Sequence, residues 1–96
     1  MNLKELFELL EKEFVKEHRQ MDLMNSEAIQ ERKKATSSIY VTDAAYYEEK
    51  AKRTQAQAQS HASICCKLAE ILATANGTTQ DQQTKLLYDK YNLWRD

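Results

Sequence analysis

His61 and Cys65 are the residues of this chain whose types and spacing could support chemistry. They stand four positions apart, so on a helix the imidazole and the thiol project from one face and could bind the same zinc ion. Two ligands do not complete a zinc site, and a full set would require the same pair from a second copy of the chain. The simpler interpretation is that both residues fill a core, because unpaired cysteine is commonly buried. We therefore predict no resident metal and no other cofactor.

The same pair could act as a cysteine nucleophile with its base, which would make the chain an enzyme. That chemistry also needs a third group to orient the base and donors that stabilise an oxyanion. The chain has a single glycine, Gly77, and no proline, so loops that present backbone donors are scarce. No Glu-x-x-His sequence is present either, and this removes the ligand signature of di-iron helical bundles. We predict that the chain is not an enzyme.

The element that carries this pair is a predicted helix over residues 43–75, which lack glycine and proline and are rich in Ala, Gln, Glu and Lys. Two series of residues repeat every seven positions along it, as in a coiled-coil seam. The first series is Ala44, Ala51, Ala58, Cys65 and Leu72, and the second is Tyr47, Thr54, His61, Leu68 and Ala75.

An amphipathic helix is predicted over residues 2–35, where Leu3, Phe7, Leu10 and Phe14 begin an apolar stripe with helical spacing. Residues 36–42 are β-branched, aromatic or serine, which favours a connection, and Thr42 or Asp43 could cap the following helix. The two helices would have nearly equal length, so the sequence favours an all-α antiparallel hairpin. The alternative is one unbroken helix, which would require an intermolecular coiled coil.

A short third helix is predicted over residues 79–94, after a turn at residues 76–78 that contains Gly77. Thr79 and Gln82 have the spacing of a capping box. The third helix carries a stripe of Leu87, Tyr91 and Trp94. This stripe would either fold back onto the hairpin or act as an anchor in the groove of a partner.

Charge does not identify a partner, because the formal net charge of the chain is only -1. Six basic residues would gather near the connection, but five acidic residues share the region, and six minus five leaves about +1. The basic residues are Arg32, Lys33, Lys34, Lys50, Lys52 and Arg53. No signal peptide and no membrane-spanning run are recognisable. We expect a cytoplasmic protein with no membrane partner, of bacterial or viral origin as readily as any other.

The segment from Thr54 to Cys66 contains no Asp, Glu, Lys or Arg, which is unusual for a helix surrounded by water. It predicts burial against other protein, in a dimer or a larger bundle. We therefore predict a protein–protein interaction module: an adaptor, inhibitor or assembly factor that self-associates or docks on a larger protein. The residues predicted to bind the partner are Leu87, Tyr91, Trp94, Ala51, Ala58, Ala62 and Cys65. A less favoured alternative is a nucleic-acid-binding module that uses the basic tip.

In format, about a hundred residues folded as two long helices, the chain resembles the small helical-hairpin partners of bacterial type VII secretion. The Trp-x-Gly turn of that family is absent, because the only tryptophan is Trp94 and the only glycine is Gly77. The resemblance implies a second alternative, a small secretion partner.

Overall fold

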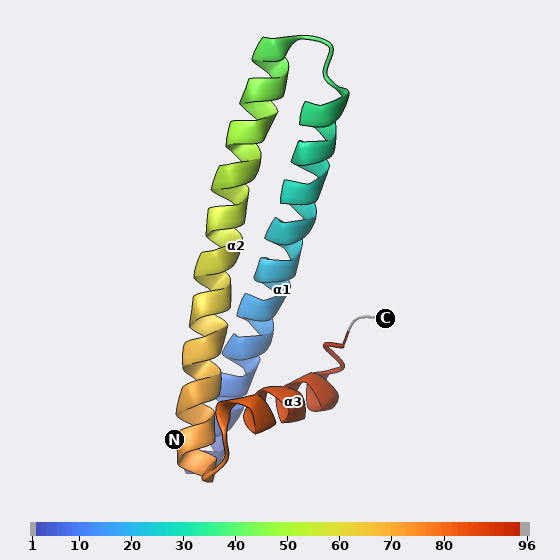
Figure 1. Cartoon of the computed structure of the whole chain (residues 1–96). Helices are drawn as coiled ribbons and strands as arrows, with labels where there is room; N and C mark the ends of the chain where they lie inside the picture. The colour runs from blue at the N-terminus through green and yellow to red at the C-terminus, as the bar shows by residue number, and fades with distance from the viewer. Residues whose placement is uncertain (1, 95–96) are drawn as a thin grey trace. The chain divides into compact units, whose positions relative to one another are not determined.

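A computed structural model of the chain describes residues 2–94, and over that range the fold is all helical (Figure 1). There are two long helices, α1 (Leu3–Ser37) and α2 (Val41–Asn76), and one short helix, α3 (Gln80–Tyr91). This confirms the prediction from the scarcity of glycine and proline. Contacts divide the chain into two compact units, each containing parts of both long helices. Unit 1 comprises Met1–His18 and Ser63–Asp96, and unit 2 comprises Arg19–Ala62.

The connection between α1 and α2 occupies only residues 38–40, whereas residues 36–42 were predicted. Thr36 and Ser37 remain helical. The hydroxyl group of each donates to the backbone carbonyl four residues earlier, at 2.9 Å in both cases. These side chains therefore satisfy acceptors at the end of α1 that would otherwise face water alone.

The predicted N-cap of α2 is wrong by two or three positions. The helix begins at Val41, and the backbone N–H of Ala44 donates to the carbonyl of Tyr40 at 3.0 Å. Thr42 and Asp43 therefore lie inside the first turn. There the carboxylate of Asp43 is favourable, because the helix dipole places partial positive charge at that end.

A glycine ends α2 as the sequence indicated. Gly77 has φ +67°, in the left-handed region. Its N–H donates to the carbonyl of Thr74 at 3.4 Å, while the N–H of Thr78 donates to that of Ala73 at 2.9 Å. This is the hydrogen-bond pattern of a Schellman motif, which satisfies the last carbonyls of a helix.

The caps of α3 decide its length. At its start, Thr79 and Gln82 form the predicted capping box. At its end, Asn92 adopts φ 55°, and the N–H of Leu93 donates to the carbonyl of Tyr88 at 2.9 Å. The left-handed residue stops the helix at Tyr91, three residues before the predicted end.

The core of unit 1 joins all three helices. Its buried members are Phe14 from α1, Cys65, Leu68, Ala69 and Leu72 from α2, and Leu87 from α3. Partly buried residues pack around this group: Phe7, Leu10, Tyr88, Tyr91 and Leu93. Burial of these apolar side chains is the main stabilising contribution to the unit.

Unit 2 is built differently, on small and polar residues. The buried Ala28, Ala51 and Ala58 allow two helix backbones to approach closely. Between the helices, the hydroxyl of Thr54 donates to Oε1 of the buried Glu31 at 2.8 Å. The other carboxylate oxygen, Oε2, is also buried and has no hydrogen-bond partner among the described residues. A buried polar contact of this kind stabilises one register of the helices more than it stabilises the fold.

Both predicted heptad series of α2 are buried or half-buried, apart from the exposed Ala75. The sequence pattern of α1 was less informative. Glu17 and Glu31 lie on its buried seam, although hydropathy alone marks these positions as interruptions.

Candidate interaction surfaces

The third helix packs within unit 1, and this decides the exposure of most of its predicted anchors. Leu87 is only 1% exposed. Cys65 is also buried, and its thiol donates to the backbone carbonyl of Phe14 at 3.7 Å. Tyr91 is half-buried against the same core. Leu87 and Cys65 therefore lie together, as the prediction requires, but the chain's own side chains cover them.

Trp94 does not continue the stripe of α3, because the left-handed Asn92 turns the chain away from the helix axis. Its ring packs edge-on against that of Tyr88, with centroids 5.0 Å apart, and its indole N–H donates to Asp89. The side chain remains 54% exposed. Among the three predicted anchors of this helix, Trp94 is the most accessible.

The neutral segment of α2 has one covered side and one exposed side. Ala51 and Ala58 are buried in unit 2, and Ala62 is half-buried. Ala56 and Gln57, on the other side, are exposed. The absence of charge over this segment is thus explained on one side by packing within the chain.

Two polar contacts hold α3 against α1 in unit 1. His18 Nε2 and the hydroxyl of Tyr88 form a hydrogen bond of 2.9 Å, and their rings meet edge-on with centroids 5.0 Å apart. Glu11 Oε1 accepts from both Lys90 Nζ and the hydroxyl of Tyr91, each at 2.7 Å. These contacts fix the orientation of α3 in the unit.

The Glu11 contact changes the acidity of its two donors. The hydrogen bond to Glu11 raises the pKa of Lys90 above 10.5, against a smaller opposing effect of burial. Burial, followed by the hydrogen bond to Glu11, raises the pKa of Tyr91 above 10.0. Both shifts lead away from neutral pH, which is opposite to the tuning expected of an acid–base catalyst.

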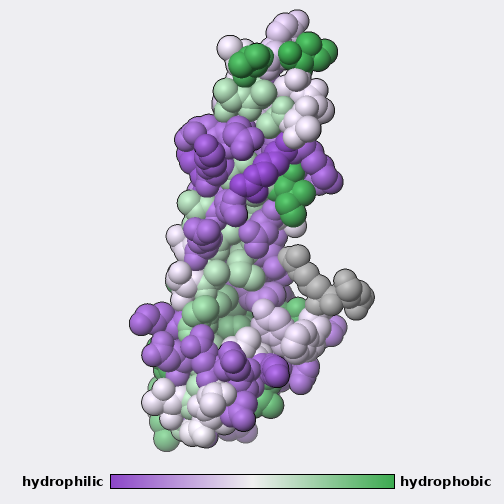
Figure 2. Space-filling view, viewed as in Figure 1, coloured by the Kyte–Doolittle hydropathy of each residue, from purple (hydrophilic) through white to green (hydrophobic). Residues whose placement is uncertain are grey.

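Large apolar side chains that the sequence analysis passed over are exposed in both units. In unit 1 they include Leu3, Leu6 and Leu9 on α1, Ile64 and Ile71 on α2, and Leu86 on α3. In unit 2 they include Leu23, Ile29, Ile39, Tyr40, Val41 and Tyr46. Apolar side chains gather visibly at the connection between α1 and α2 (Figure 2). The seven-residue spacing of Ile64 and Ile71, away from the seam, was a signal in the sequence that could have revealed one of these surfaces.

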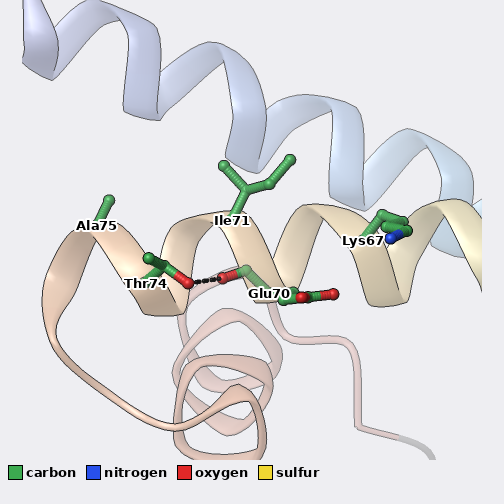
Figure 3. A pocket seen from close by; sticks show the side chains of 5 residues that line it. All are labelled: Lys67, Glu70, Ile71, Thr74 and Ala75. Atoms are coloured by element: carbon green, nitrogen blue, oxygen red, sulfur yellow. Dashed lines mark hydrogen bonds between the residues drawn. The ribbon is translucent and has the colours of Figure 1, made fainter.

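Two depressions mark the surface. In unit 1, five residues along α2 line the first: Lys67, Glu70, Ile71, Thr74 and Ala75 (Figure 3). The second, in unit 2, is lined by Ser26, Glu27, Gln30, Glu31, Lys34 and Lys50. Neither contains a histidine or a cysteine, so neither offers the Cys-His pair considered above.

The basic residues of unit 2 are partly engaged with their neighbours. The guanidinium of Arg32 donates to the side chain of Gln55, and Lys34 Nζ lies 5.6 Å from the centroid of the Tyr47 ring. Such contacts hold these cations in specific orientations rather than leaving them as a uniform phosphate-binding surface.

Metal and membrane sites were also considered. Within residues 2–94, no group of three or more His, Cys, Asp or Glu side chains is arranged to hold a metal ion. None of the helices in that range combines the length and apolar character that a membrane span requires. No protein family model matches the sequence, and no curated protein or solved structure shows significant similarity to it.

Proposed function

We propose that the chain is a non-enzymatic, cytoplasmic protein–protein interaction module: an adaptor, inhibitor or assembly factor that acts through helix–helix packing. The observation that carries the proposal is the set of large apolar side chains that stay exposed on helices whose seams are already filled. Contiguous exposed apolar surface on a helical protein is typical of an interaction site.

The architecture in this proposal is an antiparallel hairpin of the two long helices, joined to a dimeric or larger bundle. The helices contain 35 and 36 residues, and a connection of three residues is short enough for neighbouring antiparallel helices. Contacts within unit 2 have the expected direction. Glu31 of α1 meets Thr54 of α2, while the later Lys34 meets the earlier Tyr47.

The energy available from the exposed side chains is moderate. Full burial of an exposed Leu or Ile side chain contributes about 1.5–3 kcal/mol, so a half-exposed one contributes roughly half of that. Association costs at least about 4 kcal/mol in lost freedom of motion. Several of these side chains must therefore act together, which favours a partner that lies along a helix over one that contacts a single point.

The test is affinity capture from an extract of the native host, followed by titration calorimetry with the purified partner. Leu6→Glu places a charge on the exposed surface of unit 1 without altering the buried core, and it should abolish capture. Gln57→Glu places the same charge on an exposed polar position and should leave capture unchanged. Capture that is equal for both variants, or absent even after chemical crosslinking, would contradict the proposal.

The nucleic-acid alternative is separated from the proposal by fluorescence anisotropy with labelled DNA and RNA. Binding that falls steeply with added salt would show that phosphates are contacted. The proposal predicts no such binding at low salt.

A further inference from the structure

Helix α3 covers only one flank of the paired α1 and α2 segments in unit 1. On α1, the covered flank is marked by Glu11 and His18, which hydrogen-bond to α3. On α2 it is marked by Asn76, whose side-chain amide donates to Oε1 of Gln83 at 3.2 Å. The same flank of α2 carries the buried Ala69.

The other flank is uncovered. Five residues correspond to a rotation of roughly 140° around a helix, and this separates Leu6 from Glu11 on α1. The same step separates Ile71 from Asn76 on α2. Figure 3 shows the Ile71 side chain directed away from α3. Leu6, Ile64 and Ile71 are 42%, 42% and 50% exposed.

Residue size differs between the two flanks of α2. The covered flank has alanines, Ala69 and Ala73, which let α3 approach closely. The uncovered flank has isoleucines at positions 64 and 71, two helical turns or about 10.5 Å apart on one line. Isoleucine has no advantage over polar residues on a helix face that meets only water. We call the line of Ile64, Lys67, Glu70 and Ile71 the isoleucine ridge.

The isoleucine ridge is complementary to itself. In an antiparallel pair of α2 helices related by a two-fold axis, any contact between positions i and j occurs twice. If Ile64 of one copy faces Ile71 of the other, the axis passes beside Lys67. Position 70 of the second copy then lies level with position 65 of the first, about 3 Å along the axis from Lys67. Lys67 and Glu70 therefore form two equivalent pairs of opposite charge at the edge of the contact.

We infer that the isoleucine ridge binds a second copy of this chain, as an antiparallel α2–α2 contact with Ile64 opposite Ile71. The depression lined by Lys67, Ile71 and Thr74 receives Ile64 of the second copy. Leu6 lies eight residues from Phe14, level with a position eight residues from Cys65, so it borders the same contact. The net charge of -1 imposes little repulsion between copies. The inference rests on the proposed function and names the partner of this surface.

Sedimentation velocity from low micromolar to a few hundred micromolar tests the inference. The wild-type chain should dimerise reversibly, and Ile71→Glu should raise the dissociation constant roughly tenfold or more. Ile29→Glu is the matched control, because Ile29 is 53% exposed but lies in unit 2. It should leave the dissociation constant unchanged. Circular dichroism of each variant confirms that the helices remain folded.

Charge exchange and crosslinking test the register. Lys67→Glu should weaken the dimer several-fold, and the double change Lys67→Glu with Glu70→Lys should restore it. In a Cys66→Ser background, Lys67→Cys lies beside the two-fold axis and should form an intermolecular disulfide, since that bond needs Cα atoms within about 7 Å. The exposed native Cys66 is rotated by roughly 100° and should not crosslink.

A wild-type chain that stays monomeric at every concentration overturns the inference. Equal weakening by Ile71→Glu and Ile29→Glu, or a double charge exchange that fails to restore the dimer, does the same. If the wild type is monomeric yet captures a different protein through the Leu6 surface, the inference fails and the proposed function stands. If it dimerises through the isoleucine ridge and captures no other protein, the inference stands and the wider role as an adaptor fails.

Discussion

Replacement of Leu87 by alanine should destabilise unit 1 strongly, whereas the same change at its neighbour Leu86 should have little effect. Leu87 is 1% exposed and lies in the core with Phe14 and Leu72, while Leu86 is 56% exposed. The two variants remove the same atoms from adjacent positions of one helix. Their helix propensities change equally, so the difference between them isolates the contribution of core packing.

The magnitude follows from the burial. Truncation of a buried leucine to alanine costs about 2–5 kcal/mol, because the apolar transfer energy is lost and a cavity remains. A chain of this length has a free energy of unfolding of roughly 5–15 kcal/mol. Leu87→Ala should therefore remove a large share of the total stability, about 3 kcal/mol. Leu86→Ala should change it by less than about 0.5 kcal/mol, as exposed substitutions usually do.

Urea unfolding followed by two signals provides the assay. Trp94 is the only tryptophan, and its ring contacts Tyr88 of α3, so its fluorescence reports on unit 1. Circular dichroism reports on all helices together. Leu87→Ala should lower the midpoint of the fluorescence transition, with an earlier loss of fluorescence than of ellipticity if α3 detaches first.

Two results would refute this reasoning. Destabilisation of less than about 1 kcal/mol by Leu87→Ala would mean that α3 does not pack on the core as described. An equal effect of Leu86→Ala would mean that helix propensity, rather than burial, governs the change. A confirmed result would also show that loss of partner binding in a Leu87 variant reports unfolding and not a lost contact.

Three further predictions concern single contacts. Thr54→Val, which removes the donor to the buried Glu31, should lower the free energy of unfolding by about 1–3 kcal/mol, whereas Thr74→Val at an exposed position should have little effect; chemical denaturation measures both. Gly77→Ala should cost about 1–2 kcal/mol in thermal unfolding, because no atom lies near the added methyl group and only the left-handed backbone is strained. A pKa raised on folding, as for Tyr91, stabilises the folded state below the unfolded pKa of about 10.0 and loses that effect as the pH rises through the folded pKa. The urea midpoint should therefore fall above about pH 10, and less steeply in Glu11→Gln; a wild-type midpoint that is constant up to pH 11 would contradict this.

The sequence predicted the elements well, because they depend on local chemistry. The near absence of glycine and proline determined an all-helical chain, and Gly77 with the Thr79 capping box determined where α2 ends and α3 begins. The seven-residue repeat of α2 identified which of its faces is buried. Errors were confined to the ends of helices. There, hydroxyl groups that favour turns bonded to the helix instead, and Asn92 took a left-handed conformation that most residues avoid.

The tertiary structure decided which residues remain available to a partner. The sequence could not show that α3 covers Leu87 and Cys65, because burial depends on the flank to which α3 docks. For the same reason it could not show that Glu31 is buried beside Thr54 while Ile71 faces outward. Periodicity determines the side of a helix that is apolar, but only packing between distant segments determines which apolar side chains are covered and which remain free to bind.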